Sequence, residues 1–455
     1  MPVNADDPSL PEALVKTITH FAPGLFPALV DIPDPRNPTR ITYPIEEEIL
    51  VGILAFMVQV QSQRNIKYKL HTPAFIANLL TILRLAFPRS KAIFPYPDER
   101  LLVGGTLTYL LKQMDWQVFH ELRLLVIRSL LRSRCLEAFR LFGRYKIAID
   151  GTRVWVFGTT RHCAHCLTQT PKDGETIYYH AVLEAKLVVG GMAFSIATAF
   201  MENDGEEVTK QDCERKAFDR LAQQLKRDFP QLPIVLLLDG LFACERVFKV
   251  CEANGWERLI TFKEGSMPAV FAEYEALLNQ GPGQRSVVWL TVQCRQTYRW
   301  ANDVDCNGRK IHVLECVEET LDKQGVVQER TRFVHISSFR IDEKNVNALS
   351  HGGRDRWKIE NQGFNTQKTG GYELEHAYSK HNGAMKCFYL LLQIAHIFNQ
   401  LLQKGSLLRE RIRQDMGSLT VFLQMMWAVF TQVLLDGVRL EAILARRIQI
   451  RFDTS

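Results

Sequence analysis

The chain has 455 residues, of which 46% are hydrophobic and 26 are phenylalanine. This length exceeds what one hydrophobic core usually serves, so we expect two or three domains. The net charge of +6, from 56 Lys and Arg against 50 Asp and Glu, is too mild to indicate a nucleic-acid partner by itself, because an ordinary metabolic enzyme has a similar balance.

The first third of the chain predicts helices. Residues 1–35 are rich in Pro and Asp and predict a loose arm. Apolar residues then recur three and four apart, which is typical of helices, over residues 46–61, 73–86, 100–113 and 116–142. The most apolar run, residues 49–60, is too short to span a bilayer, so we interpret it as a buried helix. We predict a helical N-terminal domain over residues 1–140.

At Tyr145 the pattern changes to alternation. Residues 146–157 predict a strand, and two further runs, 178–189 and 192–201, flank Gly190-Gly191 as a hairpin. A helix, a strand, a helix and a strand are expected next, at residues 209–229, 232–238, 241–254 and 258–262. This order predicts an α/β fold with three layers, whose first part covers residues 141–265.

The rest of the chain divides into a β-rich part and a helical part. Residues 285–340 alternate again and predict five strands, within an insertion that we place at residues 266–340. Residues 345–368 predict a helix in a second part of the core, residues 341–400, and a helical C-terminal region follows at residues 401–455. Two further helices are expected at residues 385–402 and 419–444.

Three acids are the main candidates for chemistry. Asp150 and Asp239 each follow an apolar strand and precede Gly, and Glu360 lies on a basic helix four residues after Arg356. Each feature has an ordinary interpretation as a turn or a surface ion pair. If the three carboxylates converge, however, they repel one another unless a divalent cation lies between them. The set therefore predicts a magnesium site for phosphoryl transfer. Asp204, Asp212 and Glu214 also lie between the two aspartates, but we interpret them as a loop and a helix N-terminus.

A second candidate is the cysteine pair Cys163 and Cys166, whose Cys-x-x-Cys spacing suits zinc. His162, His165, His180 and Cys213 are candidates for the remaining ligands. A structural zinc site normally has a second close pair of ligands, and none is evident. Packed reduced thiols and redox chemistry therefore remain alternatives to zinc.

The acidic motifs resemble those of a known family. Ile149-Asp150-Gly-Thr152, Leu238-Asp239-Gly-Leu-Phe242 and Arg356-Trp-Lys-Ile-Glu360-Asn-Gln-Gly-Phe-Asn365 are similar to motifs of bacterial insertion-sequence transposases of the cut-and-paste DDE type. The resemblance covers about residues 140–400. It implies a ribonuclease H-like core that is interrupted by a β-rich insertion before the final glutamate. By position alone, the helical domain before the core would bind DNA.

The resemblance implies a mechanism and partners. Asp150, Asp239 and Glu360 would be catalytic and would hold two Mg²⁺ ions, with Mn²⁺ as a substitute, for cleavage and strand transfer at the element ends. The partners would be double-stranded DNA, as transposon ends and target, and a second copy of the chain. DNA contacts are expected from Arg356, Lys358, Lys368, Trp289 and Trp300. Either tryptophan could stack a flipped base, and core packing is the alternative for both.

Two positions depart from the Tyr-Arg-Glu-Lys signature of one branch of that family. Gly353 stands where the tyrosine is expected. Lys368 follows Glu360 by eight residues instead of seven. On an α-helix seven residues bring a side chain back to within about 20° of the first, so Gln367 would occupy the lysine's place.

Two other functions share the expected fold. One is a DNA-binding relative without catalysis, and the other is a structure-specific nuclease that cuts but does not join strands. The N-terminus has neither a basic segment nor an apolar one of the kind that directs secretion, and the cysteines are mostly isolated. We therefore expect a cytoplasmic, nucleoid-associated protein without a membrane segment.

Overall fold

The strands predicted for the first part of the core all form, with small changes in their bounds. The computed structural model describes residues 7–86, 101–203, 211–279, 285–291 and 293–453. The core elements are β1 Tyr145–Gly158, β2 Leu167–Gln169, β3 Ile177–Val189, β4 Met192–Met201, α8 Glu214–Asp228, β5 Ile234–Leu238, α9 Glu245–Asn254 and β6 Glu257–Thr261. The short strand β2 is an addition to the predicted set.

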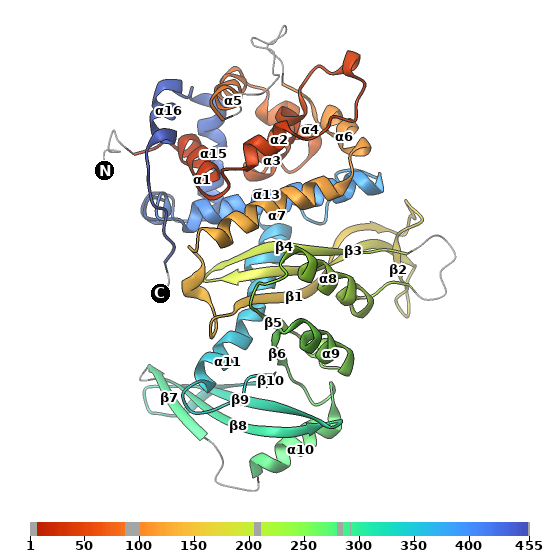
Figure 1. Ribbon diagram of the computed structural model, residues 1–455, viewed down its shortest axis with the longest axis vertical. Helices are drawn as coiled ribbons and strands as arrows, with labels where there is room; N and C mark the ends of the chain where they lie inside the picture. The colour runs from red at the N-terminus through yellow and green to blue at the C-terminus, as the bar shows by residue number, and fades with distance from the viewer. Residues whose placement is uncertain (1–6, 87–100, 204–210, 280–284, 292, 454–455) are drawn as a thin grey trace.

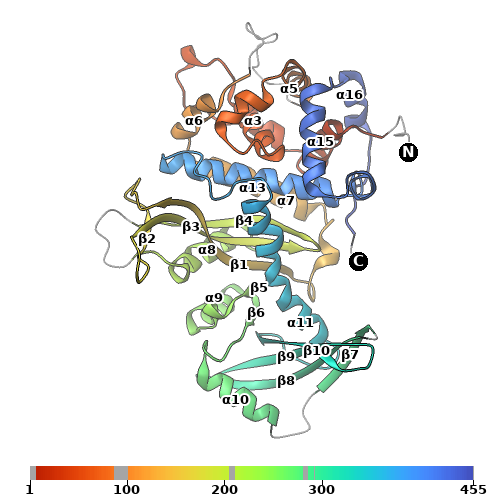
Figure 2. The same ribbon diagram turned by 180° about the vertical axis from the view of Figure 1, so that it is seen from behind.

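These strands belong to one mixed, open sheet (Figures 1 and 2). Ten strands of the described chain take part, in the order β2-β3-β1-β5-β6-β10-β9-β8-β7, and β4 pairs with β3. β1 runs antiparallel to β3 and parallel to β5, and β5 runs parallel to β6. β5 is entirely buried, which explains its continuous apolar sequence.

The β-rich insertion extends the same sheet. Its elements are α10 Pro268–Asn279, β7 Arg285–Thr291, β8 Cys294–Cys306, β9 Arg309–Leu321 and β10 Val327–Ser337. The described residues form four strands here instead of the five predicted, because the two runs expected at residues 326–331 and 333–338 form the single continuous strand β10. β10 pairs with β6 through His335, Ile336 and Ser337. The insertion is thus joined to the core by hydrogen bonds between strands.

Helices from both ends of the chain form one layer above the sheet (Figure 1). The N-terminal helices are α1 Leu10–Phe21, α2 Leu25–Val30, α3 Ile45–Met57, α4 Gln63–Asn65, α5 Pro73–Ala86, α6 Gly104–Gln113 and α7 Trp116–Arg132. The C-terminal helices are α13 Asn382–Lys404, α14 Arg409–Arg411, α15 Leu419–Gln432 and α16 Gly437–Ala445. α13 packs on α3, α7 and β4, while α15 packs on α5, and α16 on α1. The single helix predicted over 419–444 is interrupted between α15 and α16.

The loose arm predicted for residues 1–35 is wrong, because α1 and α2 lie within this segment. Ser9 and Glu12 form a capping box at the start of α1, and Pro11 occupies the first turn, where proline is tolerated. Leu10, Leu14 and Phe21 are buried. The prolines that suggested an arm therefore begin a helix of the core.

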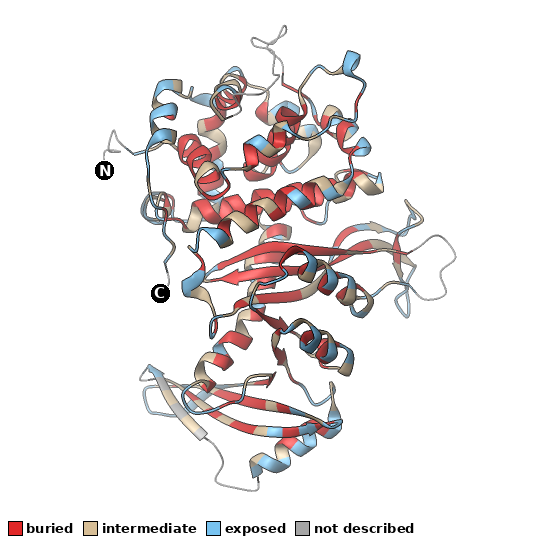
Figure 3. Cartoon of the chain, viewed as in Figure 1, coloured by how far each residue is buried: buried red, intermediate tan, exposed pale blue. Residues whose placement is uncertain are grey.

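A single apolar core extends from the helices through the sheet into the insertion (Figure 3). It also contains a polar cluster between α7 and the β3–β4 hairpin. The guanidinium of Arg123 donates to Ser195 and Thr198, and Glu184 accepts hydrogen bonds from Thr198 and Tyr389. Since Arg123 and Glu184 are both fully buried, these bonds compensate for the loss of water around the two charges.

The segment that carries Glu360 is not one regular helix. It consists of α11 Val346–Arg354, the 3₁₀ turn η5 Asp355–Trp357, the π-helical segment η6 Ile359–Asn365 and α12 Thr366–Thr369. Figure 2 shows this segment crossing the back of the sheet from the insertion toward α13. Gly363 allows the close approach of η6 to β3, because a Cβ there would lie 3.0 Å from Cδ of the buried Lys186.

Candidate functional site

Asp150 lies on β1, and Asp239 directly follows the neighbouring parallel strand β5. β1 and β5 pair from Tyr145↔Ile234 to Ala148↔Leu237. Continuing this register by two residues brings Asp150 level with Asp239, and neighbouring strands are about 4.8 Å apart. Asp150 does not end its strand, as the sequence suggested, because β1 continues to Gly158 beside β3. Asp150 lies two residues beyond Ala148, the last residue of β1 that pairs with β5.

Arg356 links Glu360 to Asp150. Its Nη1 lies 3.1 Å from Oδ2 of Asp150 and 3.3 Å from Oε1 of Glu360. The side chain of Arg356 is only 7% exposed, whereas that of Glu360 is 34% exposed. The spacing of four residues predicted that Arg356 and Glu360 share a helix face, and they form an ion pair as expected. The contact to Asp150 connects this pair to the sheet.

The surroundings of Asp150 affect its protonation. Burial and the neighbouring Glu360 raise the pKa of Asp150 well above its ordinary value, although the positive charge of Arg356 acts in the opposite direction. One guanidinium therefore does not fully balance the two acids. A further cation at this place would favour the ionised form of Asp150.

Glu214 is a fourth acid at this edge of the sheet. From the sequence it was interpreted only as part of a helix N-terminus. It lies in the first turn of α8, as predicted. Its carboxylate occupies the space that a side chain on Gly151 would need. Burial and the charge of Asp239 raise the pKa of Glu214. Glu214 therefore lies between Gly151, which follows Asp150, and Asp239. Its sequence context does not indicate this position.

The three predicted acids do not form a compact group among the described residues. Asp239 uses its Oδ1 to accept a hydrogen bond from the backbone of Leu241 at 2.9 Å, at the start of the turn η4 Gly240–Phe242. In the described part of the chain, Asp150, Asp239 and Glu360 are not a set whose ligand oxygens all lie within 4.8 Å of one another. What the structure brings together directly is Asp150, Arg356 and Glu360.

The absence of the signature tyrosine has a steric explanation. Gly353 lies at the end of α11 against β10, and a Cβ at this position would lie 2.6 Å from Cδ2 of His335. His335 is itself buried. The imidazole ring therefore fills the space next to the backbone of Gly353, and a tyrosine does not fit.

We expect Gly353→Ala to destabilise the fold by about 1–3 kcal/mol, because the new methyl group overpacks the site against His335. Gly105→Ala is the matched control, since a Cβ at Gly105 meets nothing within 4 Å. That change should be neutral or stabilising by up to about 1 kcal/mol. Urea denaturation of both variants measures the difference, and equal stabilities would contradict the steric explanation.

His335 should also make the fold sensitive to acid. Burial lowers its pKa to about 4, and the charges of Arg354 and Arg356 act in the same direction. Between pH 6.5 and pH 4 the unfolded chain binds a proton that the folded chain excludes, so stability is lost as the pH falls through this window. From pH 7 to pH 5 the wild type should lose about 2 kcal/mol more than His335→Gln. Urea denaturation at both pH values tests this, and parallel losses would refute it.

Gln367 does not take the place that the lysine of the Tyr-Arg-Glu-Lys signature would have next to Glu360. A π-helix closes its hydrogen bonds from i to i+5, so the 100° per residue of an α-helix does not apply through η6. Gln367 is buried, and its Nε2 donates to Oε1 of Gln393 at 2.8 Å. Lys368 pairs with Glu375 at 2.8 Å. The predicted alignment of Gln367 with Glu360 therefore does not occur.

The other residues predicted to contact DNA have different surroundings. Lys358 is 30% exposed and pairs with Asp355 at 2.6 Å. Trp300 is buried, at 6% exposed, so its ring packs in the core. Trp289 lies on β7 opposite Arg295, and its side chain is outside the described residues. Trp357, which the sequence analysis did not select, is 49% exposed and lies under the guanidinium of Arg356 at 4.5 Å.

The cysteine pair lies apart from the acids, at the other end of the β1–β3 hairpin. Among the described residues, Cys163, Cys166 and His180 form a group whose potential ligand atoms all lie within 4.8 Å of one another. His162, His165 and Cys213 were also candidates but do not belong to this group. Asp204 lies outside the described residues.

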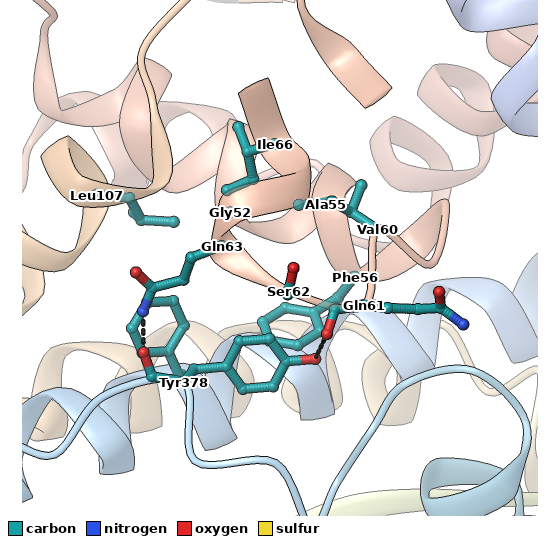
Figure 4. A pocket seen from close by; sticks show the side chains of 11 residues that line it. Gly52, Ala55, Phe56, Val60, Gln61, Ser62, Gln63, Ile66, Leu107 and Tyr378 are labelled. Atoms are coloured by element: carbon teal, nitrogen blue, oxygen red, sulfur yellow. Dashed lines mark hydrogen bonds between the residues drawn. The ribbon is translucent and has the colours of Figure 1, made fainter. Parts of the chain in front are cut away.

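An apolar pocket opens between the helical layer and the loop that follows α12 (Figure 4). Gln63 donates to the backbone oxygen of Tyr378, and the hydroxyl of Tyr378 donates to the backbone oxygen of Gln61 at 3.3 Å. None of the four acids lines this pocket. Its contacts hold the chain beyond Glu360 against the N-terminal helices.

Comparison with known proteins does not identify a family. The chain matches no protein-family model and no curated protein. Within the described residues, no helix combines the length and the apolar character needed to cross a membrane.

Proposed function

We propose that this protein is a DDE transposase that cuts and joins DNA by metal-dependent phosphoryl transfer. The observation that carries the proposal is the meeting of Asp150, Arg356 and Glu360, with Asp239 directly after β5, the parallel neighbour of β1. Asp150 and Arg356, which are more than 200 positions apart in the sequence, come together here, close to the end of the pairing between β1 and β5.

The order of the core strands supports a ribonuclease H-like fold. β4, β3 and β1 form an antiparallel meander, and β5 and β6 then add in parallel to β1. The insertion of β7 to β10 stands between β6 and the segment with Glu360. This is the arrangement of parts that the resemblance implies for a transposase with a β-rich insertion.

The side chains at the site suit Mg²⁺, which prefers carboxylate oxygens as protein ligands. Asp150, Asp239 and Glu360 would hold two ions, with Mn²⁺ as a substitute, and Glu214 is close enough to Asp239 to influence them. Bound ions supply Lewis acidity and an activated nucleophile. The surplus negative charge around Asp150 is consistent with such a site.

Arg356 would have two roles. In the metal-free protein it forms ion pairs with Asp150 and Glu360. When DNA is bound, its guanidinium would orient a phosphate of the scissile strand. The exposed ring of Trp357, next to it, is better placed than the buried Trp300 to stack on a base.

The proposal is tested with DNA from the source genome that flanks the coding region. We expect the purified protein with Mg²⁺ to cut a duplex at the junction between flank and element and to join the released 3′ end to a second duplex. Assembly on paired ends should appear as a dimer of the chain. Cutting without joining would identify a nuclease, and binding without cutting would identify a non-catalytic DNA-binding protein. Either result would refute the proposed transposase.

A further inference from the structure

We propose that Cys163, Cys166 and His180 form a zinc site that fastens the loop after β1 to strand β3. The two sulfurs lie 3.0 Å apart, and Nε2 of His180 lies 3.2 Å from Sγ of Cys163 and 3.6 Å from Sγ of Cys166. Three ligand atoms thus point at one place. This site is separate from the acids, and the proposal does not depend on the transposase function.

The spacing of the three atoms fits a tetrahedral ion. Bonds of about 2.3 Å to sulfur and about 2.1 Å to nitrogen place neighbouring ligand atoms about 3.6–3.8 Å apart. Small rotations of the side chains convert the observed distances to these. A water molecule would complete the tetrahedron.

The backbone of the turn that carries the cysteines is already fixed. Arg161 donates to the backbone oxygens of Cys163 and Ala164 at 3.2 and 3.1 Å. Asn203, at the end of β4, donates from Nδ2 to the backbone oxygen of Cys166 at 2.8 Å. A turn held in this way presents both sulfurs without further ordering, which lowers the entropic cost of binding an ion.

The histidine is held from the opposite side. His180 is 1% exposed and lies on β3 opposite Trp155 of β1. The rings of Trp155 and Phe157 meet the imidazole edge-on, with centroids 5.4 and 5.8 Å away. This aromatic surrounding fixes the ring orientation and limits the access of water to the site, as outer-shell groups do around structural metals.

The choice of zinc follows from the ligand chemistry. Thiolate and imidazole together favour zinc over magnesium, which binds carboxylates. The two metal sites would therefore select different ions in the same cell. Because β1 contains bulges on both sides of Trp155 and Val156, an ion at this place would stabilise the part of the hairpin where the strand pairing is least regular.

Metal analysis of the purified, reduced chain tests the proposal. We expect roughly one zinc per chain in the wild type and at least a tenfold lower content in Cys163→Ser, Cys166→Ser and His180→Gln. Cys213→Ser is the matched control, since Cys213 is exposed and outside the group, and it should retain the full zinc content. A wild type without zinc, or ligand variants that keep it, would overturn the site.

Two measurements on the wild type avoid dependence on variants that fail to fold. Replacement of zinc by Co²⁺ should give the absorption bands of thiolate bound to tetrahedral cobalt, and the lack of these bands would count against the site. Thiol titration of the denatured chain without reductant should find all ten cysteines free. Two missing thiols that return on reduction would instead indicate a disulfide and would refute the zinc proposal.

Discussion

Asp150→Asn is expected to lower Mg²⁺-dependent DNA cleavage by about 10³-fold or more while DNA binding persists. The amide keeps the shape of the carboxylate and can still accept a hydrogen bond from Arg356, so the fold should survive. It loses the negative charge that a divalent ion requires. Asp239→Asn and Glu360→Gln should have comparable effects, because each removes one ligand of the same proposed pair of ions.

Asp219→Asn provides the matched control for these changes. Asp219 lies on α8 and pairs with Arg246 at the surface, so its loss should leave cleavage within about twofold of the wild type. Mn²⁺ binding, followed by electron paramagnetic resonance, separates ligand loss from other causes. A triad variant that cleaves DNA and binds Mn²⁺ like the wild type would remove that residue from the proposed site.

Arg356→Gln is expected to destabilise the metal-free fold by about 3–5 kcal/mol at neutral to alkaline pH. The substitution leaves Asp150 and Glu360 facing each other without the cation that now lies between them. Arg246→Gln breaks a surface pair of similar chemistry, and its cost should stay below about 1 kcal/mol. Urea denaturation in the presence of a chelator measures both.

The stability that the Arg356→Gln variant loses should depend on pH and on Mg²⁺. Asp150 already has a raised pKa, so the folded chain takes up a proton that the unfolded chain releases, and stability falls as the pH rises through that range. Without Arg356 this decline should be steeper. Mg²⁺ should then stabilise the variant more than the wild type, because it replaces the missing charge. A loss that is independent of both pH and Mg²⁺ would indicate only a packing role for Arg356.

Much of the core could be predicted from local patterns. The alternation over residues 146–157 and the Gly190-Gly191 turn identified β1, β3 and β4, because an amphipathic or buried strand has a clear sequence period. The helix α1 was missed because its prolines were interpreted without Ser9 and Glu12, the residues that begin the helix. The packing of the N-terminal helices against the C-terminal helices could not be predicted from the sequence, because it depends on contacts between distant segments.

The site could be predicted only in part for the same reason. The candidate acids follow from apolar strands that precede an aspartate, and the ion pair of Arg356 and Glu360 follows from a spacing of four residues. The position of Glu214 beside Gly151, and of His335 beside Gly353, depends on side chains that meet across different elements. The π-helical geometry of η6 also lacks a sequence signal of its own, and it changed the surroundings of Gln367.

The shared helical layer has a consequence for how the protein is made. α7 leaves the ribosome about 250 residues before α13, on which it packs, and α3 and α1 leave still earlier. At roughly 5–20 residues per second this interval lasts on the order of 10–50 s. During synthesis, apolar surface on these early helices stays uncovered until the last part of the polypeptide arrives, so nascent chains should depend on chaperones and a fragment that ends before the sheet should aggregate.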